Sequence, residues 1–359
     1  MLICNVVGAR PNFMKAAPVI SALQARGIPQ FLVHTGQHFD ERMSGLFFRD
    51  LGLPRPDVFL GIEVATPVVQ TAQVLMALER VLQERQPGLV LVYGDVTSTV
   101  AAGLAARKAG IRVAHVEAGL RSFDPEMPEE LNRVLTDHLS QLLFTTEESG
   151  RRNLLREGMP EDAIHFVGNC MVDSLLKHLP EALARRPWEK QGLSPQGYAV
   201  LTLHRPGNVD NPDQLRETVR NLGEIAARTA VLFPVHPRTL ACLERHGIAL
   251  PASVLRREPL SYLEFVGLMS RARFVMTDSG GIQEETTVLQ VPCLTLRANT
   301  ERPVTVEMGT NRLVDHDRGA LLRAVEEIFA GTWPKGRLPP LWDGRAGDRI
   351  AAVIENALP

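Results

Sequence analysis

The sequence predicts an α/β protein built from two doubly wound domains, each with a parallel sheet. Short apolar runs such as LICNVV and LVLVY alternate with longer amphipathic stretches. The alternation restarts after a polar stretch rich in proline and glycine, RRPWEKQGLSPQG. The chain of 359 residues is also long for one hydrophobic core.

The first half of the chain contains five apolar runs, each followed by a helical pattern. Runs that are buried on both faces and separated by helices are typical of βαβ units. The runs are LICNVV, QFLVHT, LVLVY, RVAHV and QLLFT, and the expected helices include 13–26, 40–51, 97–109, 128–139 and 147–157. We assign residues 1–168 to a first domain.

The second half repeats this organisation with YAVLTLH, TAVLFPVH, ARFVMTD and VPCLTL. We assign residues 169–344 to a second domain and expect the apolar helix within 345–359 to pack back onto the first. Two doubly wound domains predict an interdomain cleft, with ligand groups at the carboxyl ends of the strands.

Composition argues against several classes of function. A formal charge of −2 and a pI near 6.6 argue against nucleic acid and anionic membrane as partners. The longest apolar runs fall well short of the ~20 residues of a spanning helix, and the opening MLICNVVGARP predicts a strand and not a secretion signal. Four scattered cysteines without a Cys-x-x-Cys pair predict a reduced, cytoplasmic protein without structural zinc.

The stretch TDSGGIQEE predicts an anion site at a helix start. Ser279, Gly280 and Gly281 would surround free amide groups where the helix dipole favours negative charge. Glu284 and Glu285 lie further into the helix and suit a neutral group that bears hydroxyls. A phosphate beside a sugar satisfies both. An ordinary glycine-rich turn with a serine cap is the alternative, but it leaves the glutamates unexplained.

Three carboxylates in the first half are candidates for proton transfer. Asp95 and Glu117 end successive apolar runs, and Glu129 opens the helical stretch PEELNRVLTDHL. Capping of a helix explains Asp95 equally well, and an acidic residue is favoured at any helix start, as at Glu129. Glu117 has no comparable structural explanation. Together the three suit acid–base chemistry at one sheet edge.

Basic residues follow strands in both halves. GARPNFMK places Arg10 and Lys15 at a helix entrance, where they are either a wall for a pyrophosphate or exposed cations. The stretch is neither G-x-G-x-x-G nor a P-loop, which argues against nicotinamide or ATP. His204 and His236 each precede an arginine closely. Ordinary packing and metal binding are the alternatives, but neighbouring guanidinium groups favour an anion.

These motifs resemble those of the non-hydrolysing UDP-N-acetylglucosamine 2-epimerases. The resemblance spans about residues 3–314 and rests on GARPNFMKAAP, GDVTST, HVEAGLRS, MPEELNR, TLHR, PVHPRT, TDSGGIQEE and TERP, in this order. It implies two Rossmann-like domains in a glycosyltransferase-B-like fold, with the active site in the interdomain cleft. It also implies a homodimer with no metal or nicotinamide cofactor.

The resemblance also implies roles for individual residues. Its catalytic residues fall on Asp95, Glu117, Glu129 and His204. Its UDP contacts fall on Arg10, Ser279, Gly280 and Glu285, beside Gly281 of the same turn, with support from Lys15, Arg133, His236 and Arg302. The implied reaction inverts C2 of UDP-N-acetylglucosamine: UDP is eliminated, 2-acetamidoglucal stays bound, and re-addition gives UDP-N-acetylmannosamine.

The sequence departs from the family pattern in a few places. Gly207 and Val304 stand where many members carry glutamate, and HFDERMSGLFF lacks a glutamine found in members that a second substrate molecule regulates. A UDP-sugar glycosyltransferase, an epimerase for a modified UDP-N-acetylhexosamine, a hydrolase of the glycal and a nucleotide-sugar sensor remain alternatives.

Overall fold

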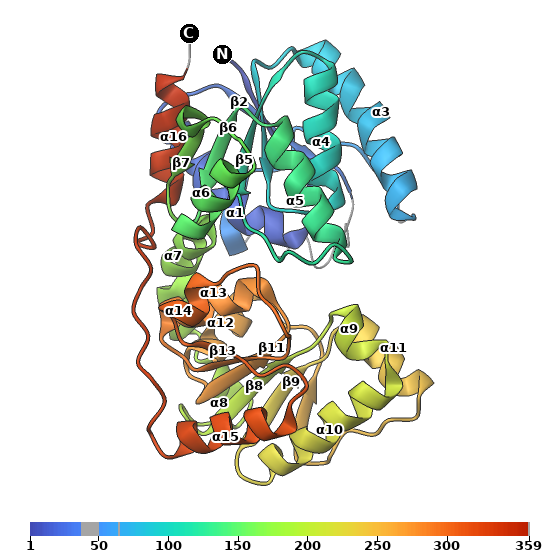
Figure 1. Ribbon diagram of the computed structural model, residues 1–359, viewed down its shortest axis with the longest axis vertical. Helices are drawn as coiled ribbons and strands as arrows, with labels where there is room; N and C mark the ends of the chain where they lie inside the picture. The colour runs from blue at the N-terminus through green and yellow to red at the C-terminus, as the bar shows by residue number, and fades with distance from the viewer. Residues whose placement is uncertain (37–49, 64, 358–359) are drawn as a thin grey trace. The chain divides into compact units, whose positions relative to one another are not determined.

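The computed structural model describes residues 1–36, 50–63 and 65–357 and divides into two compact units (Figure 1). One unit comprises Met1–Lys177 and Pro340–Pro359, and the other comprises His178–Pro339. Most of the helix expected at 40–51, and all of the HFDERMSGLFF stretch, lie outside the described residues.

The described residues of the first unit form a seven-stranded, parallel sheet in the order β3-β2-β1-β4-β5-β6-β7. Its strands are β1 (Ile3–Val7), β2 (Gln30–His34), β3 (Val58–Phe59), β4 (Leu89–Tyr93), β5 (Arg112–Ala118), β6 (Leu142–Thr145) and β7 (Ile164–Phe166). Every residue of the apolar run LVLVY in β4 is buried. This burial on both faces explains why the run is continuous and not alternating.

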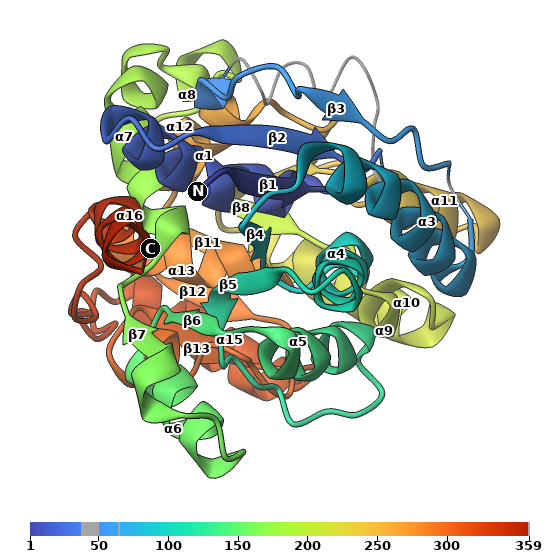
Figure 2. The ribbon, with the colours of Figure 1, turned by 90° about the horizontal axis from the view of Figure 1, so that it is seen from above.

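Helices cover both faces of this sheet. They are α1 (Arg10–Ala25), α3 (Pro67–Arg85), α4 (Thr97–Lys108), α5 (Pro128–Leu139), α6 (Glu148–Arg156) and α16 (Ala346–Asn356), with a short 3₁₀ turn at Glu161–Ala163. Helix α7 (Cys170–Ala184) begins in this unit, and its residues from His178 onward belong to the second. Figure 2 shows α3, α4 and α5 side by side. Helix α4 lies between the other two and contacts both of them. The C-terminal helix α16 packs against α1.

Two contacts fix the C-terminal segment in the first unit. The carboxylate of Asp173 accepts hydrogen bonds from the amides of Ala346 and Gly347 at 3.1 and 2.7 Å, which satisfies the start of α16. The indole of Trp342 donates to the carbonyl of Thr146 at 2.9 Å.

The second unit repeats the pattern with six described strands in the order β10-β9-β8-β11-β12-β13, all parallel. Its strands are β8 (Tyr198–Thr202), β9 (Ala230–Pro234), β10 (Val254–Arg257), β11 (Phe274–Thr277), β12 (Cys293–Thr295) and β13 (Asn311–Leu313). Its helices are α8 (Pro187–Lys190), α9 (Pro206–Val209), α10 (Pro212–Ala226), α11 (Pro237–Arg245), α12 (Tyr262–Ser270), α13 (Gly280–Leu289), α14 (Val304–Glu307) and α15 (Arg318–Phe329).

Both strand orders reverse direction at one point, between β1 and β4 in the first sheet and between β8 and β11 in the second. Ligands of doubly wound sheets bind beyond the carboxyl ends of the strands at such switch points. The predicted fold class, two doubly wound α/β units, is confirmed. No helix of the described residues has the length and apolarity needed to cross a membrane.

Candidate functional site

Asp95 and Glu117, at the carboxyl ends of β4 and β5, are each paired with a buried cation. Glu117 lies near the end of β5, and its Oε1 is 2.6 Å from Nζ of Lys15 on α1. Asp95 follows β4, and its Oδ2 accepts from Nε of Arg133 at 3.0 Å. Lys15 and Arg133 therefore hold these two carboxylates in fixed positions.

The backbone of Glu117 adopts an uncommon conformation. Its φ is +78°, and the pairing of β5 with β6 shifts register between Val116 and Ala118. A bulge of this kind turns a side chain toward a new direction, and a left-handed backbone at a residue other than glycine concentrates at functional sites. The strain supports a functional role for Glu117.

Val96, and not Asp95, occupies the N-cap position of α4. The carbonyl of Asp95 instead accepts from the side chain of Asn132 at 2.8 Å, and its carboxylate faces Arg133. Asp95 is thus tied to α5 through both its backbone and its side chain.

Glu129 and Glu130 are adjacent on α5 but lie in different surroundings. Glu130 is buried, and its carboxylate accepts from the amides of Ser122 and Phe123, from the Ser122 hydroxyl and from Arg133. Glu129 is only partly buried. Glu130 therefore anchors the loop between β5 and α5, whereas Glu129 has a side chain that can approach a ligand.

Sequence reasoning missed a buried network beneath Glu117. The ring of His115 contacts Asp137 through Nδ1 and the carbonyl of Gly94 through Nε2, each at 2.7 Å. Asp137 also accepts from the Gly119 amide at 3.1 Å and pairs with Arg121 at 2.7 Å. Although burial alone would raise the pKa of Asp137, these partners hold it below its usual range. The motif HVEAGLRS thus contains Glu117 and also His115, Gly119 and Arg121, which hold the surrounding backbone in place through Asp137.

His204 lies at the switch point of the second sheet, just after β8. Its Nδ1 is 2.8 Å from Oδ1 of Asp278, which follows β11 and is fully buried. The His204 ring is 38% exposed, so part of it faces outward. Its centroid lies 5.8 Å from that of His236. The predicted pair of histidines is therefore brought together.

His236 caps α11 by accepting the amide of Arg238 at its Nδ1, at 3.2 Å. An accepting Nδ1 carries no proton, so Nε2–H is the outward donor of this ring. Arg238 forms an ion pair with Asp210. Within the described residues, no group of three or more His, Cys, Asp or Glu side chains could hold a metal ion.

The TDSGG turn forms the predicted helix start, with Ser279 as the N-cap residue of α13. A Cβ at Gly280 would lie 2.5 Å from a guanidinium nitrogen of Arg302 and 2.6 Å from a carboxylate oxygen of Glu301. Arg302 is buried and pairs with Glu284 at 2.7 Å and with Glu301 at 2.6 Å. A side chain at position 280 would displace the ends of Arg302 and Glu301 and disturb their ion pair next to the turn.

Glu285 is buried next to Tyr262. The tyrosine hydroxyl is 3.2 Å from Oε1 of Glu285. Burial raises the pKa of Glu285 to about 8; the hydrogen bond from Tyr262 opposes this shift, and the charge of Glu284 adds to it. A carboxyl group in this state favours hydrogen bonding to hydroxyls over pairing with cations.

Two further predicted residues lie at helix starts. Arg10 is the first residue of α1, but its side chain lies outside the described part of the structure. Gly281 follows Gly280 in the first turn of α13 and is partly exposed.

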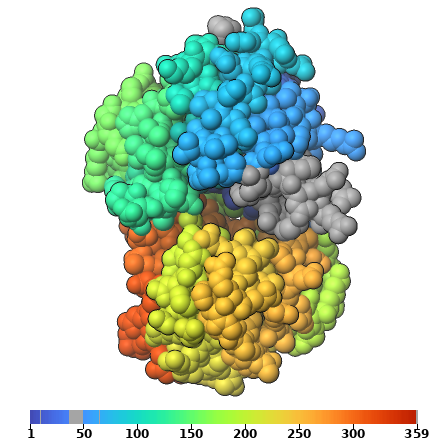
Figure 3. Space-filling view, turned by 90° about the vertical axis from the view of Figure 1, so that its right-hand side faces the viewer, coloured from blue at the N-terminus to red at the C-terminus, as the bar shows by residue number. Residues whose placement is uncertain are grey.

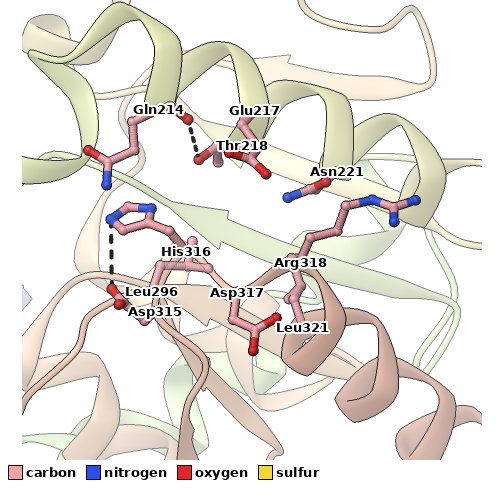
Figure 4. Close-up of a pocket in the computed structure, with 10 residues that line it drawn as sticks. All are labelled: Gln214, Glu217, Thr218, Asn221, Leu296, Asp315, His316, Asp317, Arg318 and Leu321. Carbon is pink, nitrogen blue, oxygen red and sulfur yellow. Dashed lines mark hydrogen bonds and ion pairs between the residues drawn. The ribbon is translucent and has the colours of Figure 1, made fainter.

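A small cavity of about 20 Å³ lies between α10 and the loop that leads into α15 (Figure 4). Polar side chains surround it, among them Asn221, His316 and Asp317. A water molecule needs about 10–15 Å³ of such space. The cavity therefore suits one water and is far too small for a nucleotide sugar.

Comparisons with known proteins identify relatives along the whole chain. The family model described as UDP-N-acetylglucosamine 2-epimerase matches residues 21–355. The UDP-N-acetylglucosamine 2-epimerase of Methanocaldococcus jannaschii is 41% identical, with 99% of each chain covered. The UDP-2,3-diacetamido-2,3-dideoxy-D-glucuronate 2-epimerase of Pseudomonas aeruginosa is also 41% identical, again with 99% of each covered.

Solved structures agree with these relatives. The crystal structure of the M. jannaschii UDP-GlcNAc 2-epimerase in complex with UDP-GlcNAc and UDP matches with a TM-score of 0.92 and 41% identity, covering 99% of this chain and 100% of that one. The apo lipopolysaccharide outer core galactosyltransferase WaaB matches with a TM-score of 0.57 at 13% identity over both full chains. This second likeness shows the fold alone.

The family that the motifs resemble is therefore confirmed by an independent match over most of the chain. The two parallel sheets with alternating helices also agree with the fold of these structures. This chain belongs to the UDP-N-acetylglucosamine 2-epimerase family.

Proposed function

We propose that this chain is an isomerase that interconverts UDP-N-acetylglucosamine and UDP-N-acetylmannosamine by inverting C2 of the sugar. Family membership along the whole chain supports the reaction class. The observation that carries the proposal is the fixed placement of Glu117 and Asp95 at the switch point of the first sheet. Proton removal beside an acetamido group requires positioned bases of this kind.

The proposed reaction has two half-reactions of opposite direction. One carboxylate takes the proton from C2 while the C1–O bond to UDP breaks, which leaves 2-acetamidoglucal and UDP. A second group then delivers a proton to the opposite face of C2 as UDP adds back at C1. Asp95, Glu117 and Glu129 are the proposed proton carriers, and no step requires a metal or a nicotinamide.

The departing UDP must be held so that it can return to C1. In this proposal the diphosphate charge is stabilised by the amides of Gly280 and Gly281, by the Ser279 side chain and by the imidazoles of His204 and His236. The amide of Ser279 itself donates to the Thr277 hydroxyl at 2.9 Å. Glu285 accepts hydrogen bonds from the ribose hydroxyls. Arg10 and Arg133 assist at the diphosphate.

Lys15 and Arg302 are proposed to act through the residues that they contact. Lys15 faces Glu117, and Arg302 faces Glu284 and Glu301 beneath Gly280. Their support of UDP binding is therefore indirect. That the two sets of groups meet in an interdomain cleft remains a prediction from the sequence.

We also propose that the enzyme is a cytoplasmic homodimer. Figure 3 shows α3, coloured light blue, at the surface of the first unit. Val68 and Met76 on this helix are 79% and 64% exposed, although both are apolar. Large exposed apolar side chains on one helix support a role of this helix in protein contacts. Light scattering should give twice the monomer mass for the native chain and the monomer mass for Met76→Glu combined with Val68→Glu.

A second candidate substrate has support from the comparisons. The P. aeruginosa relative, equally similar at 41% identity, is named for a UDP-2,3-diacetamido-2,3-dideoxy-D-glucuronate. A glycosyltransferase activity has weaker support, because the likeness to WaaB lies in the fold alone.

The experiment that tests the proposal follows UDP-N-acetylglucosamine with the purified chain by proton NMR, in the presence of a chelator. We expect the anomeric signal of UDP-N-acetylmannosamine to grow to a constant ratio. Release of UDP with free N-acetylmannosamine would indicate hydrolysis, and no change in the sugar would reject epimerisation. Parallel assays with the diacetamido-glucuronate nucleotide compare the two substrates by kcat/KM.

A further inference from the structure

Asp278 connects the two strand ends at the switch point of the second sheet. It follows β11, and its side chain is fully buried. Its carboxylate contacts the segment after β8, which contains His204. A buried carboxylate that serves one short loop requires an explanation beyond packing.

The two oxygens of Asp278 have different tasks. Oδ2 accepts from three donors: the amides of His204 and Arg205 at 2.9 and 2.8 Å, and the side chain of Asn208 at 3.1 Å. Oδ1 instead faces Nδ1 of the His204 ring at 2.8 Å. One oxygen therefore shapes the loop, and the other contacts the imidazole.

The contact at Oδ1 fixes where the ring carries its proton. An unprotonated ring nitrogen and a carboxylate oxygen would repel each other at 2.8 Å, since each presents a lone pair. Nδ1 of His204 therefore carries a proton in both the neutral and the charged ring. Nε2 is then the nitrogen that can receive or deliver a proton on the outward side.

His236 has the opposite arrangement. Its Nδ1 accepts from an amide, so its Nε2 permanently donates. The two neighbouring rings are thus not equivalent, and only His204 is set by a carboxylate to exchange a proton at Nε2.

The surroundings keep Asp278 ionised. Burial alone would raise the pKa of this carboxyl, but the His204 side chain and the amides of Arg205 and His204 lower it below its usual range. A permanent carboxylate is the form that orients a histidine in acid–base catalysis.

We propose that Asp278 is a positioning residue, which holds the proton of His204 on Nδ1 and so presents Nε2 to the leaving UDP. The inference rests on the proposed function for its effect on turnover. Its structural part, the tautomer of His204, does not depend on any activity. In the reaction, the doubly protonated ring can give its Nε2 proton to the departing phosphate oxygen, which leaves the neutral ring with its proton on Nδ1, and Nε2 takes the proton back on re-addition.

Asp278→Asn separates the two tasks of this side chain. With the amide oxygen at the Oδ2 position, all three loop donors keep their acceptor. The amide nitrogen then faces Nδ1 of His204, which must accept, so the proton moves to Nε2. A residue that only shapes the loop would tolerate this exchange.

Nitrogen-15 NMR of the imidazole side chains reports the tautomer directly. We expect a protonated Nδ1 for His204 in the native chain up to pH 9, and an unprotonated Nδ1 in the Asn variant. The kcat of the variant should fall at least about 100-fold, a typical loss for a proton-transfer group, with KM changed far less. Asn208→Ala, which removes one donor to Oδ2, is the matched control and should leave the tautomer unchanged.

An unprotonated Nδ1 in the native chain would overturn the proposal without any variant. Native kcat in an Asn variant whose tautomer has moved would overturn its catalytic part. If the native chain lacks epimerase activity, the proposed function fails, yet the tautomer measurement still decides whether Asp278 sets the proton of His204.

Discussion

Lys15 and Glu117 form a buried ion pair, with 2.6 Å between Nζ and Oε1 and at most 5% of either side chain exposed. Removing one partner of such a pair leaves an uncompensated charge, which typically costs about 3–5 kcal/mol. Lys15→Met should therefore destabilise the chain by roughly 3 kcal/mol and abolish turnover.

The double variant Lys15→Met/Glu117→Gln is the informative partner of this experiment. It removes both charges, so urea unfolding should show more stability than in Lys15→Met alone, while turnover stays lost. A double variant that is no more stable than the single one would argue against a direct coupling of the two charges.

Glu129 and Glu130 offer a matched pair of neighbouring carboxylates. Glu130→Gln weakens the contacts to Arg133 and to the loop at Ser122, so thermal unfolding should occur at a lower temperature. Glu129→Gln leaves these contacts intact and should lower kcat by at least about 100-fold, with a smaller loss of stability than Glu130→Gln. If Glu129→Gln instead lowered the unfolding temperature and Glu130→Gln lowered only kcat, the proposed roles of the two residues would have to be exchanged.

The raised pKa of Glu285 predicts a pH-dependent stability. Burial raises this pKa to about 8, from an ordinary value of 4.5. Between these two pH values the folded chain holds a proton that the unfolded chain lacks, so stability falls as pH rises toward 8. Above pH 8 Glu285 is ionised in both the folded and the unfolded chain, and the loss of stability caused by the buried charge is complete.

Glu285→Gln lacks this titration and should become more stable than the native chain as pH rises from 5 to 9. One pKa unit corresponds to about 1.4 kcal/mol, so the gain should be on the order of a few kcal/mol. Thermal unfolding of both chains across this range measures it. A constant difference between the two chains would show that Glu285 does not titrate in this window.

Gly280 is predicted to be irreplaceable because of the guanidinium beneath it. A Cβ at this position would meet Arg302 at 2.5 Å, whereas nothing lies within 4 Å of a Cβ at Gly207. Gly280→Ala should weaken UDP binding at least 10-fold in calorimetry, and Gly207→Ala should leave it unchanged. If the native chain, Gly280→Ala and Gly207→Ala bind UDP with equal affinity, the start of α13 is not the anion site.

Much of the fold could be predicted from the sequence because parallel strands that are buried on both faces appear in it as continuous apolar runs. LVLVY, for example, is a continuous apolar run that no amphipathic helix would produce. The strand ends were also predictable, and with them the positions of Asp95, Glu117 and His204. The strand order was not, because pairing depends on contacts far apart in the sequence.

The support of the site could not be predicted in the same way. Asp278 lies within the TDSGGIQEE stretch and Asp137 within PEELNRVLTDHL, but neither stretch reveals which residue the aspartate contacts. Their importance lies in partners 74 and 22 residues away, His204 and His115. Likewise, the difference between Glu129 and Glu130 arises from burial, which two adjacent identical residues cannot reveal in sequence.

Exchange at C2 of the sugar tests the central claim most directly. The native chain is incubated with UDP-N-acetylglucosamine in deuterated water, and C2 is followed by NMR in both nucleotide sugars. If carboxylates of the first unit remove and replace the C2 proton, the manno product should carry deuterium at C2 from its first appearance. A manno product that retains the original hydrogen at C2 would contradict this mechanism.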